Sequence, residues 1–181
     1  MSTAATEPAA TRDVTAMPAP LHQRHDKDDR LIAASFESAG AALMAGAAAE
    51  ACWLVALDGS DNALHALAAA ARMTKAAGLR CVDLVNVQPW MSKEAAQTEL
   101  LQCGWRCTAA ARDGLQAQGL AWRLHVAMGE AAPRIVEQAE TLGSVAIAIG
   151  ARGLSATEGL LLGSIVQQVL HRSRGAVLVV R

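Results

Sequence analysis

Glycines and a serine near the end of the chain have the residue types and spacing of an anion-binding loop. The segment runs from Gly150 to Ser164, with further glycines at Gly153 and Gly163. Glycine lets the backbone approach a ligand closely and adopt positive φ values, which exposes N–H groups to phosphate oxygens. We expect Ser164 and Ile165 to begin a helix, whose dipole favours an anion at its N-terminus. The pattern therefore predicts a site for a ligand that carries phosphate.

The segment matches neither common phosphate-binding motif, because it has no Gly-Lys-Ser/Thr triplet and no G-x-G-x-x-G run. Its glycines, taken alone, would also suit a flexible surface connection. Arg152 lies between the first two glycines, where it would either neutralise phosphate charge or lie in solvent. In a second turn, Asp58-Gly59-Ser60, Asp58 would either contact a ligand or cap the following helix.

The elements that position these two loops alternate between strand and helix. Short apolar runs predict strands at 53–57, 81–87, 121–126, 145–149 and 176–180, and periodic segments predict helices at 61–77, 92–118, 131–142 and 164–172. This alternation implies a mostly parallel sheet with helices on both faces. Ligands bind such sheets beyond the carboxyl ends of the strands, where the strand order reverses. The turn at Asp58 and the loop from Gly150 should therefore meet.

The first 49 residues have a different character. Residues 1–30 contain three prolines and a charge run from Arg24 to Arg30, a composition that predicts a disordered tail. Residues 31–49 are rich in alanine and predict a helix or a linker, with too many polar residues and glycines for a membrane span. We expect residues 50–181 to form one compact α/β domain that contains both loops.

The composition and charge of the chain argue against some classes of function. The chain has 181 residues, 52% of them apolar, with 16 Lys and Arg against 17 Asp and Glu. This near-neutral balance argues against nucleic acid as a partner. The four cysteines have no zinc-finger spacing, and the N-terminus lacks the features of a secretory signal. These features predict reduced thiols and a cytoplasmic location.

The spacing Gly-x2-Gly-x9-Gly-Ser resembles the nucleotide-binding signature of the universal stress protein family. The segments 54–60 and 84–87, Gly129-Glu130 and the terminal strand also resemble that family, so that the likeness covers residues 50 to 181. The resemblance implies a Rossmann-like open sheet of five parallel strands in the order 3-2-1-4-5. It also implies a homodimer paired through Ala176 to Val180, and ATP, or else ADP or AMP, in the crevice between strands one and four.

The resemblance also implies roles by position. Asp58 would lie near the adenosine, Val87 against the adenine, and the glycines with Ser164 and Ile165 on the ribose and phosphates. The complete predicted nucleotide site is Ala56, Leu57, Asp58, Gly59, Ser60, Val87, Gly150, Arg152, Gly153, Gly163, Ser164 and Ile165. Mg²⁺ would enter with the nucleotide phosphates, and no residue is predicted to be catalytic.

Three functions are consistent with these features. The leading hypothesis is a stress-response regulator whose nucleotide state tunes its dimer or its contacts with an unknown protein partner. No nucleophile–base pair or carboxylate pair is evident, which disfavours fast turnover. The alternatives are a slow Mg²⁺-dependent ATPase or nucleotidyl transferase in which Asp58 assists the metal or water, and a structural dimer that binds no nucleotide.

Overall fold

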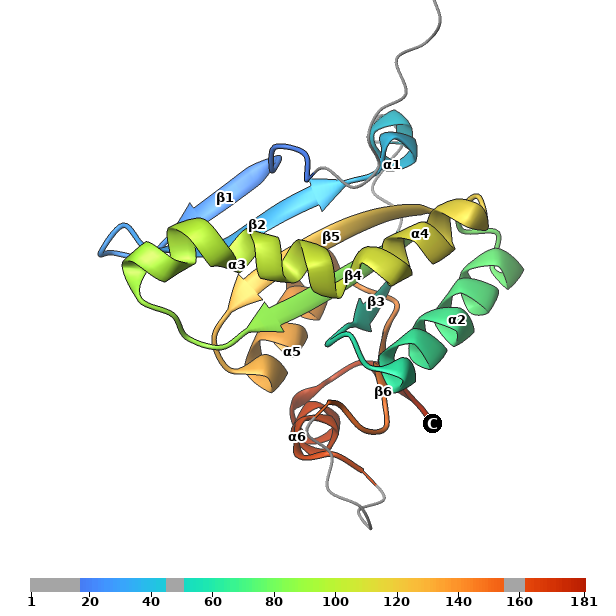
Figure 1. Ribbon diagram of the computed structural model, residues 1–181. Helices are drawn as coiled ribbons and strands as arrows, with labels where there is room; N and C mark the ends of the chain where they lie inside the picture. The colour runs from blue at the N-terminus through green and yellow to red at the C-terminus, as the bar shows by residue number, and fades with distance from the viewer. Residues whose placement is uncertain (1–16, 45–50, 155–161) are drawn as a thin grey trace, which may run out of the picture.

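The structure is a computed structural model that describes residues 17–44, 51–154 and 162–181. Its centre is a seven-stranded sheet in the order β1-β2-β5-β4-β3-β6-β7 (Figure 1). The strands are β1 (His22–His25), β2 (Leu31–Glu37), β3 (Trp53–Ala56), β4 (Cys81–Gln88), β5 (Ala121–Met128), β6 (Ala146–Gly150) and β7 (Ala176–Val180). The helices are α1 (Ala39–Met44), α2 (Asp61–Ala76), α3 (Lys93–Cys107), α4 (Ala109–Ala117), α5 (Ala131–Leu142) and α6 (Ser164–Arg172).

The parallel part of the sheet confirms the predicted α/β fold. Strands β5, β4, β3, β6 and β7 are the five predicted strands, they pair in parallel, and their order is the predicted 3-2-1-4-5. The expected total of five strands is wrong, because β1 and β2 extend the sheet beyond β5 in antiparallel pairing.

Strands β1 and β2 correct the expectation of a disordered tail up to residue 30 and of a helix or linker at 31–37. A helix does lie in the alanine-rich segment, as α1. The charge run is a hairpin turn, in which the Asp26 carboxylate accepts hydrogen bonds from the backbone N–H groups of Asp28 and Arg30. After the turn, β2 buries Leu31, Ala34 and Phe36, and the Phe36 ring lies 5.3 Å from the Trp105 ring of α3. Burial against α3 outweighs the polar composition of the hairpin. Residues 1–16 and 45–50 lie outside the described part of the chain.

The predicted helix over 92–118 is two helices, separated at Thr108. The Thr108 hydroxyl donates to the carbonyl of Gly104 at 2.8 Å, and the Arg112 guanidinium donates to the carbonyl of Trp105 at 2.8 Å. Side chains thus satisfy the last carbonyl groups of α3, so that the backbone can change direction. The same guanidinium lies 3.3 Å from the Trp105 ring centre, and burial lowers the Arg112 pKa to about 10.

Helices cover both faces of the sheet and create two apolar cores. Helices α2, α3 and α4 pack on one face, whereas α5 and α6 pack on the other (Figure 1). The strands between them are buried on both sides, as in parallel α/β sheets generally. The described helices include none that is long and apolar enough to cross a membrane.

A buried charge cluster joins β4 to β5. The fully buried Asp83 carboxylate accepts two hydrogen bonds from the Arg123 guanidinium, at 2.7 and 2.8 Å, and its Oδ1 lies 3.2 Å from Nε2 of His125. Burial acts to raise the Asp83 pKa, but hydrogen bonds with His125 and Arg123 more than compensate and hold this pKa below its ordinary value. The ionised carboxylate therefore stabilises the folded state.

We expect Asp83→Asn to lower the free energy of unfolding at pH 7 by about 3 kcal/mol, because it leaves Arg123 without a buried partner. The Asp83 pKa is depressed in the folded state, so its stabilisation is present above the unfolded pKa and is lost as the pH falls through the folded pKa. The wild-type advantage in urea unfolding should therefore shrink below pH 3.8. Glu99→Gln, on the exposed face of α3, serves as the control. A difference that stays constant from pH 7 to pH 2 would contradict this account.

Candidate functional site: a cleft beyond β3 and β6

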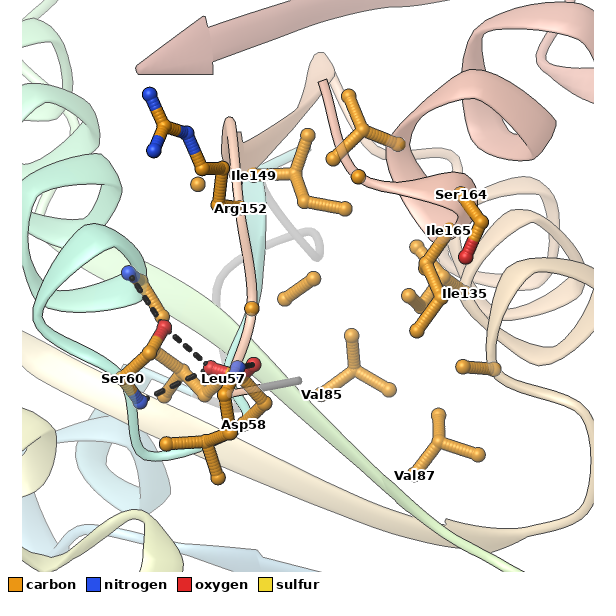
Figure 2. Close-up of a pocket in the computed structure, with 18 residues that line it drawn as sticks. Leu57, Asp58, Ser60, Val85, Val87, Ile135, Ile149, Arg152, Ser164 and Ile165 are labelled. Carbon is orange, nitrogen blue, oxygen red and sulfur yellow. Dashed lines mark hydrogen bonds between the residues drawn. The ribbon is translucent and has the colours of Figure 1, made fainter. Parts of the chain in front are cut away.

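A cavity of about 370 Å³ lies beyond the carboxyl ends of β3 and β6 (Figure 2). The helix that follows β3 and the helix that follows β6 pack on opposite faces of the sheet. The ends of these two neighbouring strands are therefore the switch point of the fold. Every predicted site residue lines the cavity except Gly59. The full lining is Ala56, Leu57, Asp58, Ser60, Ala63, Val85, Val87, Ala131, Ile135, Ile149, Gly150, Arg152, Gly153, Leu154, Gly163, Ser164, Ile165 and Val166.

Asp58 holds the two loops of the cavity together. Its Oδ1 accepts hydrogen bonds from the N–H and the hydroxyl of Ser60, at 3.0 and 2.6 Å. Its Oδ2 accepts a hydrogen bond from the N–H of Leu154 at 3.0 Å. The cap of α2 is Ser60, whose hydroxyl accepts from the N–H of Ala63. Gly59, which does not line the cavity, has a φ of 89° in this turn.

Close contacts occur at two of the three motif glycines, with the backbone of α2 at Gly150 and with a side-chain carboxylate at Gly153. A Cβ at Gly150 would lie 2.6 Å from the carbonyl carbon of Asn62 in α2, and a Cβ at Gly153 would lie 2.5 Å from Oδ2 of Asp58. The expectation of positive φ at the motif glycines is wrong, because neither these two nor Gly163 adopts one. Absence of a side chain is the property that the fold needs at Gly150 and Gly153.

The N-terminus of α6 opens onto the cavity. Gly163 is its N-cap residue in an extended conformation, and its own N–H donates to the carbonyl of Ala151 at 2.9 Å. Within the described part of the chain, no side chain caps this helix. The N–H groups of the first turn, from Ser164 to Val166, consequently lack partners within the helix and can donate to an anion.

Apolar side chains form the opposite wall, and most of them are missing from the sequence-based prediction. Val85 and Val87 project from the same face of β4, so the period of two along a strand would have added Val85. Ala131 and Ile135 come from α5 and Ile149 from β6. Their approach to the cavity depends on how α5 packs against the sheet, which no local pattern reveals.

Two ionisable side chains, Asp58 and Arg152, line the described part of the cavity. Figure 2 shows the Arg152 guanidinium extending away from Ser164 and Ile165. Among the described residues, no group of three His, Cys, Asp or Glu side chains is placed to hold a metal ion. The cavity therefore combines an apolar wall, a row of amide donors and nearly balanced charge. Such a site suits a flat apolar ring attached to an anionic group.

Solved structures with this fold include several stress proteins. One from Archaeoglobus fulgidus has 24% sequence identity and a TM-score of 0.61, covering 73% of this chain and 99% of that one. Another, solved in complex with dAMP, has 22% identity and a TM-score of 0.58, covering 74% and 100%. A universal stress protein in complex with cAMP has 26% identity and a TM-score of 0.58, covering 74% and 99%.

A search of curated protein sequences gave no match. The family model described as "Universal stress protein family" matches residues 53–181, from the start of β3 to the end of the chain. This range contains both loops of the cavity and the whole parallel part of the sheet, and it excludes the β1–β2 hairpin. The chain therefore belongs to the universal stress protein family.

Proposed function

We propose that this protein binds an adenine nucleotide in the cleft beyond β3 and β6. The observation that carries the proposal is the N-terminus of α6, which no described side chain caps and which lines the same cavity as the apolar wall. The base would pack against Val87 and Ile149, and a phosphate group would accept hydrogen bonds from the first-turn N–H groups at Ser164 and Ile165. Each half of the ligand would thus meet a surface of matching polarity.

The comparisons support an adenine nucleotide. Two family structures with this fold were solved with dAMP and with cAMP, which share the adenine base and a single phosphate group. We extend that ligand class to this chain because the first-turn N–H groups of α6 and the apolar wall face one cavity. The proposal covers ATP, ADP and AMP.

A resident Mg²⁺ site does not fit the described residues. Both Asp58 oxygens already accept hydrogen bonds from Ser60 or Leu154, and no second carboxylate lines the described cavity. Mg²⁺ would have to arrive on the phosphates of its nucleotide. Because both Asp58 oxygens already accept hydrogen bonds, Asp58 is poorly placed to assist a metal or water. Nucleotide binding is therefore better supported than the slow ATPase activity.

We propose further that the nucleotide state tunes a homodimer or contacts with a regulatory protein partner. In the described sheet β7 is an apolar strand at one edge, whereas the opposite edge, β1, is polar and exposed. Apolar edges favour pairing with another strand. Strand β7 pairs with β6, and the loop that follows β6 lines the cavity. A structural change at the cavity on ligand binding would therefore be transmitted to the dimer interface through β6.

A cytoplasmic location is part of the same proposal. It follows from the interpretation of Cys52, Cys81, Cys103 and Cys107 as reduced thiols, which a reducing compartment favours. Cell fractionation that recovers the protein outside the cytoplasm would contradict this location.

We expect Ser164→Pro to weaken binding of AMP or ATP by about ten-fold or more, because proline removes both the hydroxyl and an N–H donor. Proline suits the first position of a helix, so α6 should remain folded. Ser164→Ala, which removes the hydroxyl alone, is the matched control. Isothermal titration calorimetry would measure affinity, and circular dichroism melting would check the fold. Equal affinity in wild type and Ser164→Pro, with both folded, would refute phosphate binding at α6.

We expect Val179→Pro to convert the dimer to monomer. Hydrogen bonds alternate along a strand, and the Val180 carbonyl accepts from Ala151, so the N–H of Val179 points to the open edge. Proline there removes an outward donor without breaking the ladder to β6. Analytical ultracentrifugation would report the mass of each protein, with His22→Pro on the opposite edge as the control. A wild type that stays monomeric at high concentration would rule out the β7 dimer.

A further inference from the structure

We propose that Cys52 and Cys81 form a reversible disulfide when hydrogen peroxide oxidises the protein. Cys52 directly precedes β3, and Cys81 is the first residue of the neighbouring strand β4. Both residues lie at the opposite ends of these strands from the cleft. The disulfide is therefore a modification site outside the cleft, and its formation does not depend on the proposed nucleotide binding.

The strand register places the two cysteines opposite each other. In the parallel pairing of β3 with β4, Trp53 lies opposite Val82, so one step back along both strands brings Cys52 opposite Cys81. Paired positions of a sheet project their side chains from the same face, and the two cysteines accordingly share one small buried cluster. Neighbouring strands lie about 4.8 Å apart, which is within the roughly 4.4–6.8 Å that separates the Cα atoms of a disulfide.

The two side chains already interact, and the backbone beside each of them is fixed. The thiols of Cys52 and Cys81 share a hydrogen bond. The Cys52 carbonyl accepts a hydrogen bond from the N–H of Val145 at 3.0 Å. Next to Cys81, the Arg80 carbonyl accepts one from the N–H of Ala121 at 2.9 Å. A disulfide therefore requires rotation of two side chains rather than a movement of the strands.

Burial keeps the pair reduced at rest. Both residues are thiols in the structure, with Cys52 2% exposed and Cys81 7% exposed. The hydrogen bond with Cys52 and burial raise the pKa of the Cys81 thiol, although the nearby Arg123 guanidinium acts in the opposite direction. Protonated and shielded thiols react slowly with oxidants. We therefore expect the disulfide to form only under sustained exposure to peroxide, as for a transient disulfide of a reducing compartment.

The reaction balances with hydrogen peroxide as the oxidant. One cysteine loses its thiol proton and its sulfur attacks a peroxide oxygen, so that the O–O bond breaks and a sulfenic acid and one water form. The neighbouring sulfur then attacks the sulfenic sulfur, the S–O bond breaks, the S–S bond forms and a second water leaves. Two electrons pass from the sulfur atoms to the peroxide. A thiol reductant reverses the reaction by exchange.

The disulfide would change the stability of the domain. It would close the segment from Cys52 to Cys81, which contains β3 and α2. Because closing a loop restricts the unfolded chain, we expect oxidation to raise the melting temperature by about 5 °C or more. The strand spacing of about 4.8 Å is shorter than the usual 5.5–6 Å between the Cα atoms of a disulfide, which favours a strained bond that thiols reduce readily.

The test uses the full chain with Cys103→Ser and Cys107→Ser, because these two more exposed thiols of α3 would otherwise consume peroxide. After incubation with hydrogen peroxide, mass spectrometry of a non-reduced digest should find a peptide pair joined through Cys52 and Cys81 and lighter by two hydrogen atoms. Thermal melting of the same sample should show the rise in melting temperature. Dithiothreitol should abolish both the cross-link and the rise.

Cys81→Ser in the same background is the matched control, and we expect it to show neither the cross-link nor the rise. Each protein is compared with itself before and after peroxide, so that an effect of the substitution on stability cancels. Three outcomes would each overturn the proposal: a sulfinic or sulfonic acid at Cys52 or Cys81 without a cross-link, a cross-link between two chains, or thiols that remain unmodified in excess peroxide.

Discussion

The candidate site depends on the carboxylate of Asp58. Its two oxygens accept hydrogen bonds from Ser60 in the turn after β3 and from Leu154 in the loop after β6. These loops are 96 residues apart in the chain, and the shared carboxylate holds them at one end of the sheet. A Cβ at residue 153 would lie 2.5 Å from Oδ2 of Asp58, so a larger residue there would displace this carboxylate. Without this bridge, the described start of the loop at Leu154 would lose its link to the turn after β3.

The rest of the fold supports that end of the sheet. Parallel strands place the ends of β3 and β6 side by side, and α5 supplies the apolar wall opposite the loop. At the far side of the sheet, the β1–β2 hairpin covers β5, a strand that would otherwise form an edge. The hairpin is polar where it is exposed and apolar where β2 meets α3. One edge of the sheet is thereby protected, and β7 remains the apolar edge.

Much of this arrangement could be predicted from the sequence, because the relevant signals are local. Apolar runs and glycine positions identified the five parallel strands, and the resemblance to the family identified 11 of the 18 residues that line the cavity. The hairpin was missed because its stability comes from packing of Phe36 against α3, which outweighs a disorder-prone composition. The break at Thr108 and the wall residues Ala131 and Ile135 likewise depend on tertiary contacts. Close packing at Gly150, where positive φ was expected, is also invisible in one sequence.

The most direct test of the account is an NMR titration of the ¹⁵N-labelled protein with AMP. It follows the backbone N–H groups that are proposed to donate to the phosphate. The account predicts that the largest and saturable shifts fall on Ser164, Ile165 and Val166, with further shifts from Gly150 to Leu154. Saturable shifts confined to other surfaces, such as the β1–β2 hairpin or the Asp83 cluster, would contradict it.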